Sequence, residues 1–201
     1  MGRPRQHDES TRLALLDAAE RLIERDGPDA ASVRAVAEAV GTTTRAVYSV
    51  FGSKDGMLEA LAIRLFDVLI AAIDACPRTD DPVDDLVEAS LNGFRRTVLE
   101  HPALYSLVFL RVVPGLRLGD DFAATAGAAF GRLESLVERL STEGVIPKSV
   151  LPGAALAVHA LTEGLASMEI RGMLAAADDP ETAWRTSLRS LLTGFAAAGN
   201  S

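Results

Sequence analysis

Side chains that can form hydrogen bonds are concentrated in residues 42–54 of this 201-residue chain. Threonine and serine hydroxyls donate and accept hydrogen bonds, arginine can pair with guanine edges or with phosphate, and tyrosine carries a hydroxyl on a rigid ring. Lysine adds a positive charge that phosphate attracts. These residue types suit contact with DNA, and we predict DNA contacts from Thr42, Thr43, Thr44, Arg45, Tyr48, Ser49 and Lys54.

A short helix over residues 43–51 would present most of these side chains on one face. At ~100° per residue the apolar side chains share one side of the helix, and they are Ala46, Val47, Val50 and Phe51. The polar side chains on the opposite side are Thr44, Arg45, Tyr48 and Ser49. A helix this short is not stable alone, so we predict that its apolar side packs against neighbouring helices.

Two helices are predicted upstream of this segment. The first begins near residues 8–10 and ends at Asp26. The second begins at Ser32, which is suited to cap it, and ends where Gly41 can adopt a left-handed conformation. We add Ser32 and Arg34, at the start of the second helix, to the predicted DNA contacts. Two helices joined by a tight turn that contains glycine form a helix-turn-helix pattern.

Lys54 lies in the first turn of the next predicted helix, which Ser53 can cap and which runs to Ala75. A cation there opposes the helix dipole at a cost of up to about 1 kcal/mol. A phosphate that docks at this helix end would explain the lysine. A solvated surface lysine explains it equally well, and the sequence leaves both interpretations open.

The composition is typical of a folded globular chain, with 48% hydrophobic and 24% charged residues. The net charge is −8, yet residues 1–64 carry nine basic and ten acidic side chains, so most of the excess acid lies downstream. Bulk charge therefore gives DNA binding no support. A DNA-binding surface would depend on cations that are placed locally.

Cys76 is the only cysteine, which excludes an internal disulfide and zinc sites built on several thiolates. The N-terminus lacks the apolar run of a secretory signal. The longest charge-free stretch of the C-terminal half, residues 149–162, is too short to span a membrane. We therefore predict a cytoplasmic protein with no membrane partner.

The rest of the chain shows helical spacing punctuated by proline and glycine, without strand alternation. The later helices are expected at residues 83–100, 102–114, 120–141, 152–176 and 180–198. We predict an all-α fold of about nine helices in two domains, residues 1–52 and 53–201. The first is a three-helix DNA-binding domain with the helix-turn-helix, and the second is a helical bundle.

The N-terminal helices resemble the DNA-binding domain of the TetR family of bacterial transcriptional regulators. The matching segments are LLDAAERLIERDG, SVRAVAEAVG and TTTRAVYSVFGSKDGMLEAL. Tyr48, Phe51 and Lys54 correspond to a tyrosine, a phenylalanine and a lysine of the family pattern. Val50 stands where a histidine is common, which puts a contact from that position in doubt. Arg45 replaces a frequent small residue and can add a base or phosphate contact.

The resemblance implies a transcriptional repressor that binds a pseudo-palindromic operator in double-stranded DNA. It also implies a homodimer formed through the last two helices, and a second domain that binds a small-molecule effector without a cofactor. The segment HPALYSLVF, residues 101–109, resembles a segment in the effector domains of one TetR subgroup.

Large aromatic side chains in the later helices stand among many alanines and glycines. Such a bundle can leave an apolar cavity with a few polar groups that orient an apolar guest. Plain core packing is the commoner role of any one of these residues. The candidates for effector contact are Phe94, Tyr105, Phe109, Arg111, Phe130, His159, Glu163 and Trp184.

His159 and Glu163 are four residues apart on a predicted helix and could share a metal ion. No third ligand is evident nearby, so we predict a polar pair within a bundle or a dimer interface and no metal site. Nucleophile-elbow and phosphate-loop motifs are absent, so we predict no catalytic residue and no enzyme. The alternative function is a helical small-molecule-binding or metal-binding protein whose DNA-binding domain is vestigial.

Overall fold

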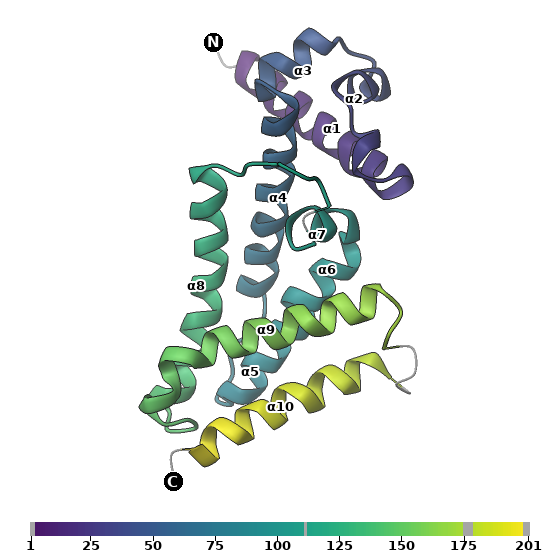
Figure 1. Ribbon diagram of the computed structural model, residues 1–201. Coiled ribbons are helices and arrows are strands. Elements are labelled where there is room, and N and C mark those ends of the chain that lie inside the picture. Colours follow the sequence, from purple (N-terminus) through teal and green to yellow (C-terminus); the bar gives the residue numbers. More distant parts are fainter. Residues whose placement is uncertain (1–2, 111, 175–178, 199–201) are drawn as a thin grey trace. The chain divides into compact units, whose positions relative to one another are not determined.

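The computed structural model describes residues 3–110, 112–174 and 179–198 (Figure 1). Every regular element within these residues is helical, and none is a β-strand. Nine helices are present in the described residues if the continuous helical run at residues 82–100 is counted once. The predicted all-α fold is therefore confirmed.

Contacts between Cα atoms divide the chain into two compact units. Unit 1 contains Met1–Phe66 and His101–Thr125, and unit 2 contains Asp67–Glu100 and Ala126–Ser201. The division falls inside two long helices, α4 (Lys54–Asp74) and α8 (Asp120–Thr142). The predicted domain boundary after residue 52 lies between α3 and α4, within unit 1, so the compact units and the predicted domains are different divisions of the chain.

Unit 1 begins with the helices of the predicted helix-turn-helix domain. They are α1 (Arg3–Asp26), α2 (Val33–Val40) and α3 (Thr44–Phe51), with a 3-10 turn (Pro28–Ala30) after α1. Ser32 caps α2, because its hydroxyl accepts a hydrogen bond from the Ala35 N–H at 3.1 Å. Gly41 ends α2 at φ 73°, and the next N–H, from Thr42, donates to the Ala37 carbonyl. Both predicted caps of α2 are confirmed.

The core of unit 1 also includes α7 (Pro102–Val108), which follows α4 by some distance in the sequence. Buried apolar side chains from α1, α2, α4 and α7 form one cluster with Val47 of α3. The segment that resembles an effector-domain motif thus packs against the predicted DNA-binding helices. The predicted helix to residue 114 is too long: α7 ends at Val108, where the Phe109 N–H, which donates to the Tyr105 carbonyl, closes the last turn.

Unit 2 contains a helical run with a π-helical centre. The elements α5 (Pro82–Glu88), η2 (Ala89–Arg95) and α6 (Arg96–Glu100) follow one another without a break. Asp81 caps this run, because its carboxylate accepts hydrogen bonds from two backbone N–H groups. Gly93 of the π-helix packs closely on α4, where a Cβ would lie 2.7 Å from Cγ1 of Ile73. Only glycine permits this approach without a shift of the neighbouring side chain.

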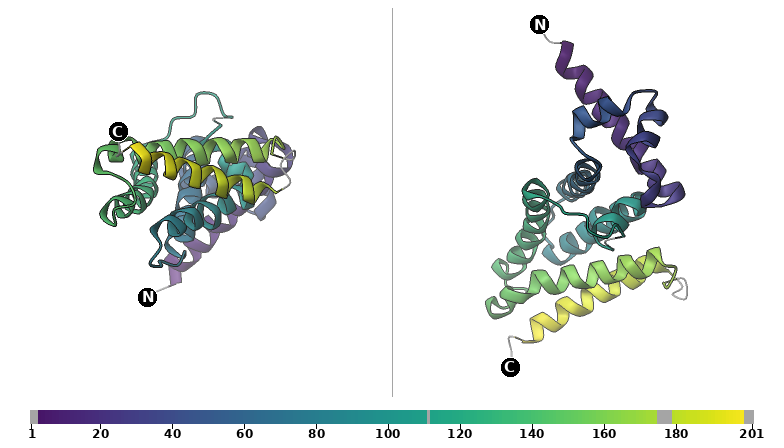
Figure 2. Two further views of the ribbon diagram at one scale, coloured as in Figure 1. Left: turned by 90° about the horizontal axis from the view of Figure 1, so that it is seen from below. Right: turned by 45° about the horizontal axis from the view of Figure 1, so that its top comes forward.

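The last two helices, α9 (Leu151–Ile170) and α10 (Pro180–Ala198), lie side by side (Figure 2). A 3-10 turn (Lys148–Val150) precedes α9. The bounds of α10 agree with the prediction, but α9 ends before the predicted residue 176, which lies outside the described residues. It ends because Gly172 adopts φ 71° and the Met173 N–H donates to the Met168 carbonyl.

Among the described residues, one helical stretch, Lys148–Ile170, is long and apolar enough to cross a membrane by length and composition alone. The core helix of a soluble protein can meet the same criterion, although only 33% of the 18-residue segment that meets it is buried within the chain. Its apolar surface includes Leu156, whose exposed fraction is 63%. The exposed part of α9 is therefore a surface that another apolar partner could cover.

Candidate DNA-binding surface and effector module

The short helix α3 is two-faced, as its sequence pattern predicts. Val47 is completely buried, and Val50 and Phe51 pack against the core of unit 1. The guanidinium carbon of Arg12, on α1, lies over the Phe51 ring at 6.0 Å from its centroid. The opposite face of α3 is exposed to solvent, and its side chains are Thr44, Arg45, Tyr48 and Ser49.

Hydroxyl caps fix where α3 and α4 begin. The Thr43 hydroxyl accepts a hydrogen bond from the Ala46 N–H at 3.2 Å, and the Ser53 hydroxyl accepts one from the Gly56 N–H at 2.9 Å. Thr43 is thus a cap as well as a predicted DNA contact. Its hydroxyl proton is still free for donation to a phosphate, because the cap uses an oxygen lone pair.

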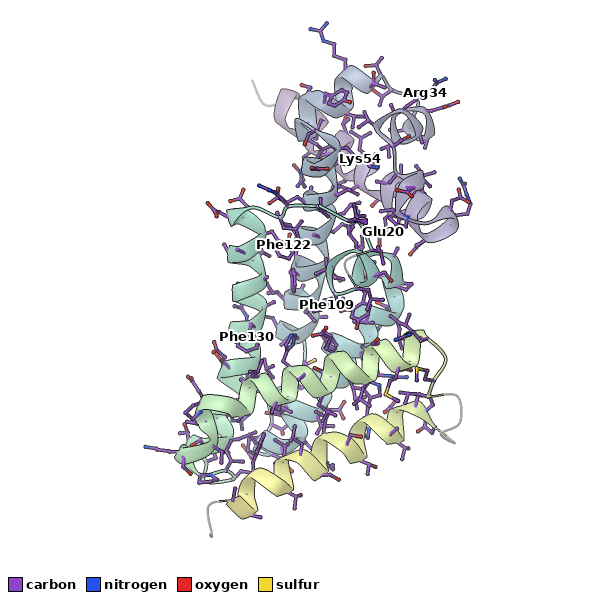
Figure 3. The ribbon with its side chains drawn as sticks, viewed as in Figure 1. Glu20, Arg34, Lys54, Phe109, Phe122 and Phe130 are labelled. Atoms are coloured by element: carbon purple, nitrogen blue, oxygen red, sulfur yellow. The ribbon has the colours of Figure 1, made fainter. Side chains whose placement is uncertain are left out.

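The predicted cations near α3 are Arg34, Arg45 and Lys54. Arg34 on α2 and Arg45 on α3 are exposed, whereas Lys54, the first residue of α4, is half-buried (Figure 3). Thr42 and Ser32 are also half-buried. The predicted DNA-binding residues thus lie on α2, on α3 and at the start of α4, or immediately before α2 and α3.

A buried polar network in unit 1 was not predicted. Glu20 of α1 has an exposed fraction of only 7%, and its carboxylate lies 2.6 Å from Nδ1 of His101, at the start of α7. Arg64 of α4 lies 3.7 Å from the same carboxylate and donates to Asp17 at 2.5 Å. The network ties α1, α4 and α7 together. Glu20 and His101 are 81 residues apart, and no local sequence pattern links them.

The predicted effector contacts are split between the two units. Tyr105 and Phe109 lie in unit 1, where their rings stack at 5.0 Å and Phe109 also lies 5.9 Å from Phe66. Tyr105 is completely buried. Arg111 lies outside the described residues. The remaining predicted contacts are in unit 2, and they are Phe94, Phe130, His159, Glu163 and Trp184.

In unit 2, Phe94 and Trp184 form a buried aromatic pair with ring centroids 6.4 Å apart. The Trp184 indole N–H donates to Glu169 at 2.8 Å, and the Arg95 guanidinium donates to both oxygens of the same carboxylate. The hydrogen bonds that Arg95 donates to Glu169 raise the pKa of Arg95 above its ordinary value. Glu169, which was not among the predicted site residues, thus accepts the hydrogen bond of the buried tryptophan, and Arg95 pairs with the same carboxylate.

His159 and Glu163 also lie in unit 2. Nε2 of His159 lies 3.5 Å from the Glu163 carboxylate, and the imidazole makes an edge contact of 5.7 Å with Phe130. Both side chains are half-buried. Within the residues that the structure describes, no group of three or more His, Cys, Asp or Glu side chains is arranged to hold a metal ion.

A pocket of about 640 Å³ opens in unit 2 between the end of α4 and the α5–η2–α6 run. Of the described residues predicted to contact an effector, none lines this pocket. Its lining includes Cys76, Asp85, Asn92 and Thr97. A pocket formed by helices that are distant in sequence leaves no periodic signal, which is why the sequence analysis missed it.

The last two helices bury one face against each other and expose the other. Ala154 of α9 and Leu188 and Leu192 of α10 are buried within unit 2, so they belong to the core of the chain rather than to a surface for a second copy. The exposed stripe of α9 repeats every four residues, and it consists of Leu156, Ala160, Gly164 and Met168. Small exposed residues on α10 include Thr186, Ser190 and Gly194.

Two family models match this chain. Residues 15–61 match the model described as bacterial regulatory proteins of the tetR family, and this match runs from the second half of α1 to the first turns of α4. Residues 87–191 match the model described as the tetracyclin repressor-like C-terminal domain, which spans more than half of the chain.

Relatives and solved structures show the same similarity. The nicotine-responsive transcriptional repressor HdnoR of Paenarthrobacter nicotinovorans is 37% identical over 75 residues, which is 37% of this chain and 37% of that protein. The HTH-type transcriptional regulator Rv0681 of Mycobacterium tuberculosis is 27% identical over 86% of this chain and 74% of its own length. The structure of the regulator PfmR from Thermus thermophilus aligns with a TM-score of 0.64 at 21% identity, over 89% of this chain and 97% of that one.

Proposed function

Because the chain belongs to the TetR family of bacterial transcriptional regulators, we propose that it is a dimeric repressor that responds to a small molecule. Family membership makes the chain a DNA-binding transcriptional regulator and not an enzyme. The observation that supports operator binding best is the exposed polar face of α3, which the packing of Val47 directs away from the core. We place the protein in the cytoplasm, where bacterial DNA is accessible.

In the proposed complex, α3 enters the major groove of double-stranded DNA. Arg45 would read base edges, while Tyr48 and Lys54 would hold phosphates, because a tyrosine hydroxyl can donate a hydrogen bond to a phosphate oxygen and a lysine ammonium is attracted to its charge. A two-fold dimer places two copies of α3 about 34–36 Å apart, one turn of DNA. The operator would therefore be pseudo-palindromic.

Lys54→Ala is expected to weaken binding on every DNA sequence and to reduce the slope of log affinity against log salt by about 1. The reason is that one phosphate contact releases about one counterion. The measurement is fluorescence anisotropy with duplex DNA from the region upstream of the protein's own gene, at several salt concentrations. Tyr48→Phe should weaken binding on all sequences with a smaller change of slope, because its hydroxyl is neutral.

Arg45→Ala in the same assay separates base contacts from phosphate contacts. If Arg45 binds a guanine through both nitrogens, its loss costs about 1–3 kcal/mol on the preferred site and little on others. A uniform loss across a randomised duplex library would assign Arg45 to phosphate instead. Failure of the wild-type protein to bind any duplex at low salt would favour the alternative of a small-molecule-binding protein with a vestigial DNA-binding domain.

We propose that the exposed stripe of α9 and the small residues of α10 form the dimer interface. Leu156, with an exposed fraction of 63%, would be buried at its centre. Small side chains at Ala160 and Gly164 let two helices approach closely. The interface uses the outer face of these helices, whereas Leu188 and Leu192 face the core.

Leu156→Asp is therefore expected to convert the dimer to a monomer and to abolish tight operator binding, because a charge would be buried in an apolar interface. Sedimentation equilibrium measures the change. Leu99→Asp is the matched control, since Leu99 is a leucine with an exposed fraction of 41% on another helix. Equal dimerisation of the wild type and the Leu156 variant would exclude this interface.

The effector of the proposed repressor would be a small molecule with an apolar body. HdnoR is named as nicotine-responsive, but its alignment covers 37% of this chain, so we transfer only the general idea of a small-molecule response. Helix α4 starts at Lys54 and ends in unit 2, so one helix runs from a proposed phosphate contact into the effector module. In the proposed mechanism the dimer has two helix arrangements. A ligand that binds one arrangement better than the other would shift the dimer toward the arrangement that it prefers.

A further inference from the structure

The pocket in unit 2 has the size of a small-molecule site. Its volume of about 640 Å³ lies within the ~300–1,000 Å³ that is usual for such sites. One wall is apolar and comes from the end of α4 and the connection after it, with Val68, Ala72, Ala75 and Pro77. The opposite wall comes from the α5–η2–α6 run and is polar. A ligand that fills this pocket would therefore need one apolar side and one polar side.

Thr97 of α6 is a buried polar residue of this polar wall. Its exposed fraction is 2%, and it lines the pocket. No hydrogen bond to its hydroxyl is found among the described residues, and this hydroxyl is not one of the fully buried atoms that lack a partner, so a ligand in the pocket can reach it. A ligand in the pocket would supply the missing partner.

The π-helix contributes a second polar group. Single π-helical segments are rare and occur frequently at functional sites. Asn92 of this segment lines the pocket, and its amide N–H donates to Glu88 at 2.6 Å, which leaves the amide oxygen as the group it can offer. Gly93 packs on Ile73 at the same level, so the π-helical segment is held firmly against α4.

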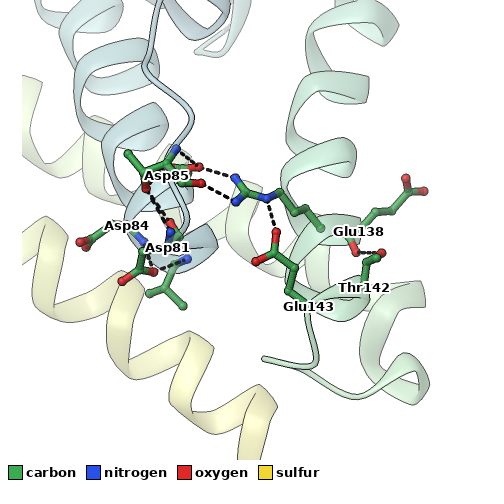
Figure 4. Close-up of polar contacts among 9 residues, drawn as sticks. Asp81, Asp84, Asp85, Glu138, Thr142 and Glu143 are labelled. Carbon is green, nitrogen blue, oxygen red and sulfur yellow. Dashed lines mark hydrogen bonds and ion pairs between the residues drawn. The ribbon is translucent and has the colours of Figure 1, made fainter.

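The charges around the pocket favour a cation. Asp84, Asp85, Glu88 and Glu100 line it together with a single guanidinium, that of Arg96. Figure 4 shows that Asp85 contacts a guanidinium from α8, that of Arg139.

Each of these four carboxylates has a guanidinium partner, which for Glu100 is Arg96, but two of the four guanidiniums are shared with further carboxylates outside the pocket lining. Arg139 is shared between Asp85 and Glu143, and Arg185 of α10 is shared between Glu88 and Glu181. Arg189 pairs with Asp84. Six carboxylates therefore surround four guanidiniums, and the polar wall presents mainly hydrogen-bond acceptors. A bound group that donates hydrogen bonds and carries positive charge would satisfy both features.

We propose that this pocket binds a small organic ammonium ion with an apolar body. The ammonium N–H groups would donate to Thr97, Asn92 and the nearby carboxylates, and the apolar body would lie on Val68 and Ala72. If the bound ammonium ion is also the effector, that part of the assignment rests on the proposed function. Binding itself is a property of unit 2 and can be measured without DNA.

Isothermal titration calorimetry with phenethylammonium tests the proposal on the full-length protein. The wild type is expected to bind it with a Kd of about 1 mM or tighter, and at least about tenfold more tightly than 2-phenylethanol, which has the same ring but no charge. Anionic 3-phenylpropionate should not bind. Thr97→Val keeps the shape of the side chain and removes the hydroxyl, so it should weaken phenethylammonium binding about fivefold.

Two controls locate the site. Thr142→Val changes an exposed threonine at the end of α8, outside the pocket lining, and should leave the Kd unchanged. Cys76 lines the pocket and is the only cysteine, so alkylation with N-ethylmaleimide should block binding. Equal affinity for the ammonium ion and the alcohol, or equal Kd values for the Thr97 and Thr142 variants, would overturn the proposal. If the protein bound phenethylammonium but bound no DNA, the proposed function would be overturned and the proposed ammonium site would stand.

Discussion

Trp184→Ala is expected to lower the free energy of unfolding by about 3–5 kcal/mol, which is typical for removal of a fully buried tryptophan. Trp184 has no exposed surface and packs against Phe94 in unit 2. Its indole N–H also donates to Glu169 at 2.8 Å. The variant would therefore leave a cavity. It would also remove one of the donors to the Glu169 carboxylate, which would keep its hydrogen bonds from Arg95.

Urea unfolding followed by far-UV circular dichroism measures this change, because Trp184 is the only tryptophan and its replacement removes the fluorescence signal. Trp184→Phe is the matched variant, since it keeps an aromatic ring beside Phe94 and loses the N–H donor. We expect an intermediate cost of about 1–3 kcal/mol from the lost hydrogen bond and the smaller ring. A Trp184→Ala protein with the wild-type urea midpoint would show that this side chain is not a core element.

Local sequence signals predicted the helix-turn-helix accurately, because the interactions that define it join residues close in sequence. The predicted caps made by Ser32 and Ser53 span three residues each, and Gly41 ends α2 through its own backbone conformation. The period of apolar residues then assigned the buried face of α3, with Val47 at its centre. Each of these features depends on the local chain and can be read without the tertiary structure.

The polar networks were not predictable in the same way. Glu20 meets His101 across 81 residues, Arg139 meets Asp85 across 54, and Arg95 meets Glu169 across 74. Each pair depends on which helices pack together, and the sequence of either helix alone contains no sign of its partner. The same reason explains why aromatic residues selected as effector contacts, such as Trp184 and Tyr105, are buried in cores.

Predictions for the ends of the later helices depended on glycine conformation. The helix predicted to run to residue 176 ends earlier, because Gly172 follows α9 with a positive φ. Glycine inside an apparent helical pattern is compatible with continuation or with a cap. The contact that decides between them, from Met173 to Met168, appears only in the structure.

Asp85→Asn is expected to cost about 3 kcal/mol of unfolding free energy near neutral pH, because Asp85 is a buried carboxylate whose partners are placed for its charge. Its exposed fraction is 3%. It accepts hydrogen bonds from the Thr79 N–H at 2.9 and 3.0 Å, from the Thr79 hydroxyl at 2.8 Å and from Arg139. Asparagine would turn an N–H group toward one of these donors and leave it unpaired.

The cost should depend on pH in a defined direction. Burial by itself would raise the pKa of Asp85, but the hydrogen bonds from Thr79 and the charge of Arg139 outweigh it, so the pKa is lower than usual. The unfolded chain, with an aspartate pKa of about 3.9, therefore takes up the proton first as the pH falls. The stabilisation by Asp85 is complete above that pH and is lost as the pH falls toward the pKa of the folded state.

Urea unfolding of the wild type and the Asp85→Asn variant between pH 2.5 and 7 measures this dependence. The difference between the two proteins should be constant above about pH 5 and should shrink below about pH 4. Asp84→Asn is the matched control, because the Asp84 side chain has an exposed fraction of 48% in its ion pair with Arg189. That exposed pair should contribute less than about 1 kcal/mol. If the difference in unfolding free energy between the wild type and the Asp85→Asn variant stayed constant down to pH 2.5, packing and not the charge of Asp85 would connect α5 to α8.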